Sequence, residues 1–337
     1  MPFRSIVGHQ RVISLLSRAV ARDVMPPAVL MAGPAGVGKR LTAVAVAQAI
    51  NCLQPRSGDG LERDACGECT ACRRIARGVH PDVIIVEPGD TGSITVDQLR
   101  DVVDRSQYRP FEGRRRVVIV DNADAAAAPA QSALLKTLEE PPSASIFILI
   151  SSIPDALLPT VLSRCPRLRF GPLSPAEIAT ILIRDHKFSE ADARAAAADA
   201  DGSVGRAIEA QSADVTGARE AAQRLLQETA RSSDPARRLA LARDLTGAKG
   251  TPAEERNQLA VCLRSLGSLL RDIGIITMRA DRASLANADL EPQLERFSAS
   301  FDPERSVRAY AAVDQALVAL ERNASPKVVA DWLLLQL

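Results

Sequence analysis

Aromatic residues are scarce in this sequence: seven Phe, two Tyr and one Trp make up 3% of its 337 residues. Proteins that recognise single-stranded nucleic acid stack bases on aromatic side chains, so the composition argues against that class of binding module. The net charge is also small, +1 from 42 Lys and Arg against 41 Asp and Glu. Because phosphate neutralisation supplies most non-specific affinity for nucleic acid, any DNA contact is expected to be local or shared with partners.

Long apolar runs are missing as well. The amino terminus, MPFRSIVGHQRVISLL, lacks the continuous apolar segment of a signal peptide, and no later run reaches the roughly 18 apolar residues of a membrane-spanning helix. Cysteines are few, but three of the six crowd into seven positions, at Cys66, Cys69 and Cys72. This spacing is typical of a metal site in a reducing compartment and not of a disulfide framework. The sequence therefore predicts a cytoplasmic protein.

Short apolar runs alternate with helical patterns through the first half of the chain. Four runs are rich in β-branched or aliphatic residues without polar alternation, which is typical of strands buried on both faces of a parallel sheet. The runs are 28–32, 83–86, 117–120 and 146–150, and helical patterns occupy 41–50, 96–106 and 130–140. The alternation predicts an α/β parallel-sheet domain over residues 1–170.

Strand signals stop after this domain. Ser174-Pro175-Ala176-Glu177 combines an N-cap residue, a Pro at the first helical position and a carboxylate in the first turn, which predicts a helix to about residue 184. We expect a small helical bundle over 171–210 and an all-α segment over 211–337, where only helical periodicity is present. A chain of this length has room for such a division into two or three domains.

A glycine-rich segment follows the first predicted strand. Gly33, Gly36, Gly38 and Lys39 have the GxxxxGK spacing of a phosphate-binding loop, in which backbone N–H groups and the helix N-terminus bind phosphate oxygens. A solvated glycine-rich turn is the alternative interpretation. The residue after the lysine is normally Ser or Thr, whose hydroxyl ligates Mg²⁺; here it is Arg40, which has no acceptor atom.

Asp121 ends the third predicted strand, the usual place of the residue that holds Mg²⁺. In ATPases of this layout a neighbouring Glu polarises the attacking water. Asn122 takes that place here, and an amide cannot act as a general base. The sequence therefore predicts that any ATP bound at this loop is hydrolysed very slowly, and it shows no constellation of carboxylates for a polymerase active site.

A structural Zn²⁺ takes four soft ligands in a tetrahedron. The sequence offers four thiolates, at Cys52, Cys66, Cys69 and Cys72. A thioredoxin-like redox pair is the competing interpretation, but the third and fourth cysteines disfavour it. His80 is an alternative ligand, although a loop residue before the second strand is expected there, and residues 54–64 are expected to form a polar loop. Cys165 and Cys262 stand alone and are predicted to be buried thiols.

In their order along the chain, these motifs resemble the bacterial DNA polymerase III clamp-loader family, and within it the delta-prime type of subunit. The motifs are Val7-Gly8-His9-Gln10, the phosphate loop, the cysteine cluster, 80–82, 134–142, 163–165 and 202–206. The gap after Cys52 is longer than is usual in the family. The resemblance covers the chain to about residue 210 by motif, and beyond that by helical character.

The resemblance implies an AAA+ nucleotide-binding domain over 1–170 with a zinc module at about 51–80, a helical lid over 171–210 and a collar over 211–337. The collar would assemble five subunits, including motor subunits and delta, that load the sliding clamp onto primed DNA. Delta-prime subunits generally do not hydrolyse ATP, which agrees with the substitutions in the loop. A motor subunit of the same family, or a stand-alone NTPase remodelling nucleic acid, remains the alternative.

Three polar residues acquire roles only through the resemblance. Arg164 would enter the nucleotide site of a neighbouring subunit as an arginine finger, although a surface arginine is the alternative interpretation. Arg206 would sense phosphate in this chain's own site, and Ser151 would be the polar sensor at the end of the fourth strand. The basic run Arg114–Arg116 is predicted to be a solvated turn and not a DNA contact.

Overall fold

The structure, a computed structural model, describes residues 1–89, 91–200, 202–212, 215–231, 234–246, 251–280, 282, 285, 287, 290–298, 300–322 and 324–337. Over these residues the chain forms two compact units. The first comprises Met1–Gly89 and Ser93–Ile208, and the second consists chiefly of Glu209–Leu337. All the nucleotide-site and metal-site residues predicted from the sequence therefore fall within the first unit.

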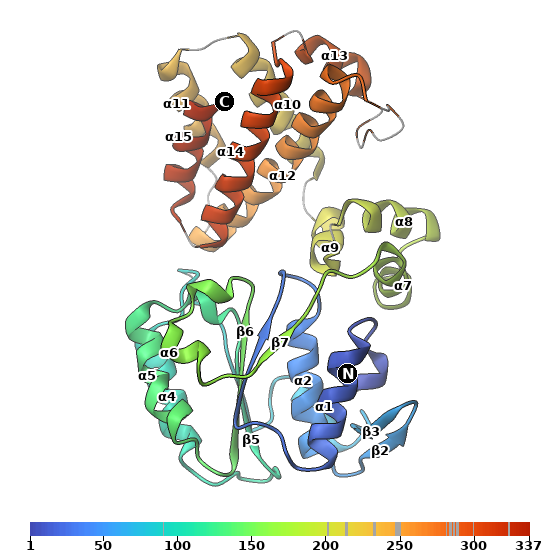
Figure 1. The fold of residues 1–337 in the computed structure, drawn as a ribbon, viewed down its shortest axis with the longest axis vertical. Helices are drawn as coiled ribbons and strands as arrows, with labels where there is room; N and C mark the ends of the chain where they lie inside the picture. The colour runs from blue at the N-terminus through green and yellow to red at the C-terminus, as the bar shows by residue number, and fades with distance from the viewer. Residues whose placement is uncertain are drawn as a thin grey trace. The chain divides into compact units, whose positions relative to one another are not determined.

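A five-stranded parallel sheet forms the centre of the first unit (Figure 1). Its order is β4–β5–β6–β1–β7, with β1 at Ala28–Ala32, β4 at Val83–Val86, β5 at Arg116–Val120, β6 at Ser145–Ser151 and β7 at Arg167–Arg169. The four predicted strands are confirmed to within one residue at each end. Ala32 and Ser151, the last residues of β1 and β6, lie side by side, so the segments that follow leave the same edge of the sheet.

Helices cover both faces of the sheet because side chains alternate between the faces along each strand. The face carrying Val29 and Met31 packs against α1 and α2, and the face carrying Ala28 and Leu30 packs against α4 and α5 (Figure 1). These helices are α1 Gln10–Ala21, α2 Lys39–Asn51, α4 Val96–Ser106 and α5 Ala128–Glu139. The three predicted helices of the α/β domain are thus confirmed to within two residues.

Residues 54–64 do not form the predicted polar loop. They contain an antiparallel hairpin of β2, Arg56–Gly58, and β3, Leu61–Asp64. Asp59 and Gly60 at its turn have φ angles of 52° and 79°, the conformation that two-residue hairpin turns require and that Asp-Gly favours. The prediction was wrong because the polar composition of the segment concealed this turn signal, although Leu61 is buried in the core.

Two further elements differ from the prediction. Strand β7 was missed because it lies at the sheet edge, pairs only with β1 and carries exposed arginines at both ends. The sequence predicts one short helix over 154–162, after the fourth strand, but this segment is divided into η3, Pro154–Ala156, and α6, Pro159–Leu162. The division follows from the second proline, which lacks an N–H and restricts the preceding residue, so that Leu158 has a ψ of 139°.

The basic run Arg114–Arg116 is only partly the solvated turn that was predicted. Arg116 begins β5, is 8% exposed and pairs with the buried Asp82 at 3.1 Å. Its guanidinium also donates to the carbonyl oxygens of Tyr108 and Arg109, at 2.9 and 3.2 Å. The other two arginines pair with Asp23 at the surface. The third arginine therefore organises the loop that leads into β5.

Asp82 is the anionic centre of the same loop. Its carboxylate accepts N–H groups of Phe111, Glu112 and Gly113 at 2.7 to 2.9 Å, in addition to Arg116. Burial acts to raise the pKa of Asp82, but these donors outweigh burial and hold the pKa below its ordinary value. The stabilisation is therefore present above the unfolded pKa, about 3.9, and is lost as the pH falls through the lower folded pKa.

Asp82→Asn is expected to lower the free energy of unfolding by about 3 kcal/mol at pH 7, because it leaves a buried guanidinium without its counter-charge. Urea denaturation followed by circular dichroism measures this quantity. Asp23→Asn is the matched control: its pairs with Arg114 and Arg115 lie at the surface, and the expected cost is under about 1 kcal/mol. Equal losses in the two variants would contradict the assignment.

Three helices follow the sheet in the chain, and the third begins in the first unit and extends past its last residue, Ile208. They are α7 Pro175–His186, α8 Glu190–Asp199 and α9 Val204–Ser212, packed around Ile178, Leu182 and Phe188. The predicted start of α7 is confirmed, since Ser174 and Glu177 form a reciprocal capping box. A short connection therefore leads from the sheet directly into this helical segment.

The second unit is helical over its described residues. Its helices are α10 Val215–Arg231, α11 Pro235–Thr246, α12 Pro252–Thr277, α13 Glu291–Ser298, α14 Pro303–Glu321 and α15 Pro326–Gln336. Leu263, Leu266 and Leu270 of α12 lie at the centre of its core, which also includes Val313 and Leu334. None of the helices in the described part of the chain is long and apolar enough to cross a bilayer. The predicted fold class, a parallel P-loop α/β domain followed by helical segments, is confirmed.

Candidate functional site

The phosphate loop joins β1 to α2. Gly38, with a φ of 100°, is the residue before the first turn of α2, and only a residue without a Cβ adopts this conformation readily. Lys39 is buried, and its ammonium donates to the carbonyl oxygens of Gly33 and Pro34 at 2.5 and 2.6 Å. Burial lowers the pKa of Lys39 to about 8, although Asp124 and Asp121 oppose this shift. The Lys39 ammonium thus contacts the loop at which a phosphate would bind.

The start of α9 lies directly against this loop. A Cβ at Gly36 would come within 2.3 Å of the Ser203 hydroxyl oxygen, so only glycine fits there. The N–H of Gly205 donates to the Gly36 carbonyl at 3.2 Å, and the N–H of Arg206 donates to the Ser203 hydroxyl at 3.2 Å. The structure therefore brings the backbone of Arg206 close to the phosphate loop, and the sensor role of its side chain stays a prediction.

Arg40 forms an ion pair where a P-loop protein would hold Mg²⁺. Its guanidinium lies 3.4 Å from an Asp121 carboxylate oxygen and pairs on its other side with Glu87. Glu87 and Asp121 follow the neighbouring strands β4 and β5, so the sheet brings both carboxylates to the loop. Burial raises the pKa of Asp121, with Arg40 acting in the opposite direction. The residues do not fit a Mg²⁺ site, because the hydroxyl ligand is absent and a cation already pairs with the carboxylate.

Ser151 and Asn122 also lie at the ends of strands. The Ser151 carbonyl accepts the N–H of Gly33 at 3.2 Å, while its buried hydroxyl has no partner among the described residues. A buried polar group without a partner is unusual and is compatible with a ligand that completes the site. Asn122 is exposed beside Asp121 and offers only an amide where a hydrolytic site needs a carboxylate.

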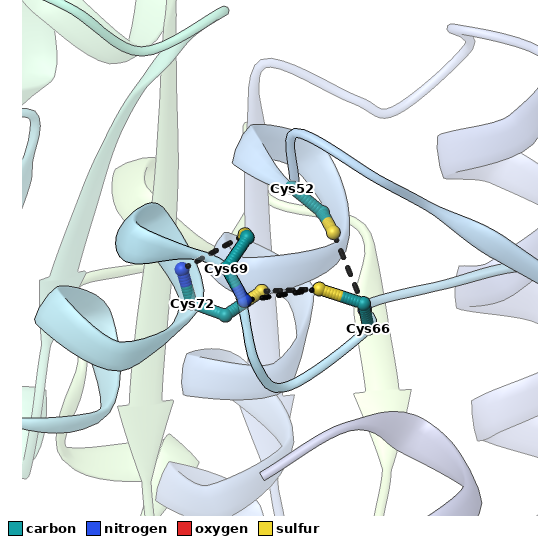
Figure 2. A group of neighbouring side chains, drawn as sticks. All are labelled: Cys52, Cys66, Cys69 and Cys72. Carbon is teal, nitrogen blue, oxygen red and sulfur yellow. Dashed lines mark hydrogen bonds between the residues drawn. The ribbon is translucent and has the colours of Figure 1, made fainter.

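The four cysteines of the predicted metal site converge in space (Figure 2). Cys52 follows α2, Cys66 follows β3, Cys69 precedes α3 (Thr70–Ala76), and Cys72 lies within α3; their sulfur atoms are all within 4.8 Å of one another. Backbone N–H groups of Cys66 and Cys69 donate to the sulfurs of Cys52 and Cys66 at 3.2 and 3.3 Å. Such N–H···S bonds stabilise thiolates, and this donor set fits a tetrahedral metal ion.

The chain's amino terminus is tied to the cysteine cluster. Arg4 donates to the carbonyl oxygens of Ala65 and Cys66 at 2.9 and 3.0 Å and pairs with Asp64 at 3.1 Å. Gln48 of α2 donates to the Cys72 carbonyl at 2.7 Å. The cluster is therefore hydrogen-bonded to the amino-terminal segment and to α2 of the α/β core. In the sequence it is separate from the phosphate loop.

The other candidate ligands are not part of this cluster. His80 does not belong to the group of metal-ligating side chains found among the described residues; one ring nitrogen accepts the N–H of Asp82 at 3.2 Å. Cys165 and Cys262, predicted to be buried thiols, are 4% and 5% exposed. Burial raises the pKa of each to about 11, so both are unreactive thiols at neutral pH.

Arg164 lies just after α6 and is only partly buried. Its guanidinium donates to the Thr160 carbonyl at 2.7 Å and to the Ser163 hydroxyl at 3.1 Å, and it pairs with Glu139 at the end of α5. The residue is therefore oriented by its own helix while part of its charged group reaches solvent. Sequence reasoning missed the partners Glu139 and Glu87; the latter could have been found from its place directly after a buried strand.

The parallel sheet, the glycine-rich loop and the helices that follow define the first unit as a P-loop α/β domain. Residues 8–174 match the family described as "DNA polymerase III, delta subunit". This match and the relatives described below support a clamp-loader delta' assignment.

Two relatives are named DNA polymerase III subunit delta'. The protein from Pseudomonas aeruginosa is 41% identical over 153 residues, which cover 45% of this chain and 45% of that protein. The protein from Bacillus subtilis is 35% identical over 173 residues, covering 51% of this chain and 50% of that protein. The gamma/tau subunit of Mycobacterium bovis is 35% identical over 182 residues, covering 54% of this chain and 31% of that protein. The chain thus spans about half the length of the delta' relatives that it matches.

Proposed function

We propose that this chain is a delta-prime-type subunit of a DNA polymerase III clamp loader that does not hydrolyse ATP itself and donates Arg164 to a neighbouring motor subunit. The proposal assigns residues 1–170 to the nucleotide-binding domain, 171–210 to a lid and 211–337 to the collar of a pentameric assembly. Motor subunits and delta would be its direct partners. The sliding clamp and primed DNA would be reached through the assembly.

The ion pair of Arg40 with Asp121 carries the proposal that hydrolysis is absent. A hydrolysing P-loop site needs a metal ion to neutralise charge on the transferring phosphoryl group, and a base or positioning group for the attacking water. Arg40 takes up the carboxylate that would hold the metal, and Asn122 cannot accept the proton of the water. Both requirements are therefore unmet in this chain's own site.

The position of Arg164 supports the arginine-finger role. A finger must be held at a surface, with its guanidinium free enough to meet phosphate in another subunit. Arg164 has this arrangement: two hydrogen bonds to its own segment orient it, and its ion-pair partner Glu139 is half exposed. Exchange of one exposed carboxylate for a phosphate oxygen costs little, because surface ion pairs contribute under about 1 kcal/mol.

We further propose that the cysteine cluster holds one structural Zn²⁺. Four thiolates are a closed ligand set with no open position for a substrate, which is typical of structural and not catalytic zinc. The hydrogen bonds from Arg4 and Gln48 to the surrounding backbone support a role in holding the amino terminus and α3 against α2.

The isolated chain is expected to show no measurable ATP turnover, because its site lacks both the metal ligand and the base. A coupled assay with and without Mg²⁺ measures this rate. Turnover on the order of one per second, an ordinary enzyme rate, that disappears in Lys39→Ala would show that the site is competent and would favour a motor subunit instead. Turnover that survives Lys39→Ala indicates a contaminating ATPase and calls for repurification.

A further inference from the structure

Three charged side chains meet at the opening of the phosphate loop. Arg40 is the second residue of α2, Glu87 follows β4 and Asp121 follows β5, and the guanidinium pairs with both carboxylates. Asp121 is largely buried, with 14% of its side chain exposed, whereas 53% of the Arg40 side chain is exposed. The guanidinium therefore bridges an inner and an outer carboxylate, and about half of the Arg40 side chain stays exposed to solvent.

The other charged groups near the loop are already engaged. Lys39 donates to two loop carbonyls, and the carboxylate of Asp124 accepts the N–H of Ser152 at 3.1 Å. Asp121 also accepts the N–H of Asn122 at 3.0 Å. A divalent cation would have to displace Arg40 from Asp121 and would then lie beside a permanent positive charge.

We propose that the phosphate loop of this chain binds a nucleoside diphosphate or triphosphate without a divalent cation, with the Arg40 guanidinium serving as the cation. The inference deepens the proposed nucleotide site and rests on it. A guanidinium suits this task because its fork of N–H groups can donate to a carboxylate on one edge and to a phosphate on the other. Lys39 and the loop N–H groups would supply the remaining phosphate contacts.

The charges of Arg40 and Asp121 explain why nucleotide binding would not require a metal ion. A Ser or Thr in the place of Arg40 would leave the phosphates facing Asp121 without a cation, so Mg²⁺ would be needed to bring them together. With Arg40 in place, chelation of the metal removes nothing from the site. Excess Mg²⁺ would bind the phosphate oxygens of the nucleotide in solution and would thereby compete with Arg40 for them.

The test measures binding of ADP and ATP to the full chain by isothermal titration calorimetry, in EDTA and in excess Mg²⁺. For the wild type we expect dissociation constants that agree within about threefold between the two buffers. Arg40→Thr should weaken binding at least tenfold in EDTA and recover most of it in Mg²⁺, because the restored hydroxyl and the freed Asp121 form a metal site. Arg100→Thr, at an exposed residue of α4 paired with Asp97, should behave as the wild type.

Three results would overturn the inference. The first is wild-type binding that requires Mg²⁺ by more than tenfold, and the second is Mg²⁺-free binding that survives Arg40→Thr. The third is no binding of either nucleotide in either buffer, with folding verified by circular dichroism. None of these outcomes bears on the finger role of Arg164, which is measured in the site of a neighbouring subunit, so the two proposals fail separately.

Discussion

Cys66→Ala is expected to abolish zinc binding and to loosen residues 51–80 while the parallel sheet stays folded. Cys66 follows β3, and its thiolate is one of four that would hold the ion. Three remaining ligands bind Zn²⁺ far more weakly, and structural zinc sites supply on the order of 10 kcal/mol of binding free energy in small domains. We expect a decrease of about 10 °C or more in the melting temperature of the first unit.

Elemental analysis and hydrogen exchange together test this expectation. The wild-type chain, purified without chelator, should contain about one equivalent of zinc, and the variant none. Amide exchange should accelerate in β3 and α3 of the variant while β5 and β6 remain protected. Cys165→Ala is the matched control, since it removes a buried thiol outside the cluster and should retain the zinc. A wild-type chain without zinc would refute the metal site.

Arg164→Ala is expected to slow hydrolysis in the neighbouring motor subunit by about 10³ while leaving this chain folded and assembled. A finger in trans acts on charge that develops during phosphoryl transfer, so ATP binding by the neighbour should change little. Arg164→Lys should restore little activity, because a flexible point charge does not reproduce a planar fork of donors. The loss corresponds to about 4 kcal/mol of transition-state stabilisation.

The loss at a single site is measured by single-turnover hydrolysis in a reconstituted assembly. All motor subunits except the neighbour would carry a P-loop Lys→Ala substitution, so that only the site facing Arg164 reacts. A filter-binding measurement with the same assembly gives the ATP affinity. Equal loss of affinity and rate would indicate a ground-state contact in place of a finger.

The sheet was predictable because its central strands are buried on both faces, which requires uninterrupted apolar runs such as Val117–Val120. Strand β7 was not predictable on this basis, because an edge strand of three residues needs only Leu168 to face the core. The β2–β3 hairpin was not predictable for a similar reason: only Leu61 contributes to the core, and the Asp-Gly turn lies in a segment whose polar composition predicts a loop. Elements that bury most of their side chains were therefore predictable from the sequence, whereas elements that bury a single side chain were not.

Some features of the candidate sites depend on residues close together in the sequence, and others depend on contacts between distant residues. The phosphate loop and the spacing of Cys66, Cys69 and Cys72 are local patterns, so the sequence alone indicated them. The pairing of Arg40 with Glu87 joins residues far apart in the chain, and it depends on the strand order that places β4 beside β5. The pairing of Arg164 with Glu139 depends likewise on the packing of α6 near α5. No spacing rule gives such contacts.

The central claim is that this chain acts on a neighbour's ATP while its own site does not hydrolyse. Its most direct test is the rate of DNA- and clamp-stimulated ATP turnover by the reconstituted assembly, with wild-type, Arg164→Ala or Arg100→Ala chain. We predict that Arg164→Ala lowers the rate only partly, because other motor sites would draw their fingers from other subunits, and that Arg100→Ala leaves the rate unchanged. An unchanged rate with Arg164→Ala in a fully assembled complex would contradict it.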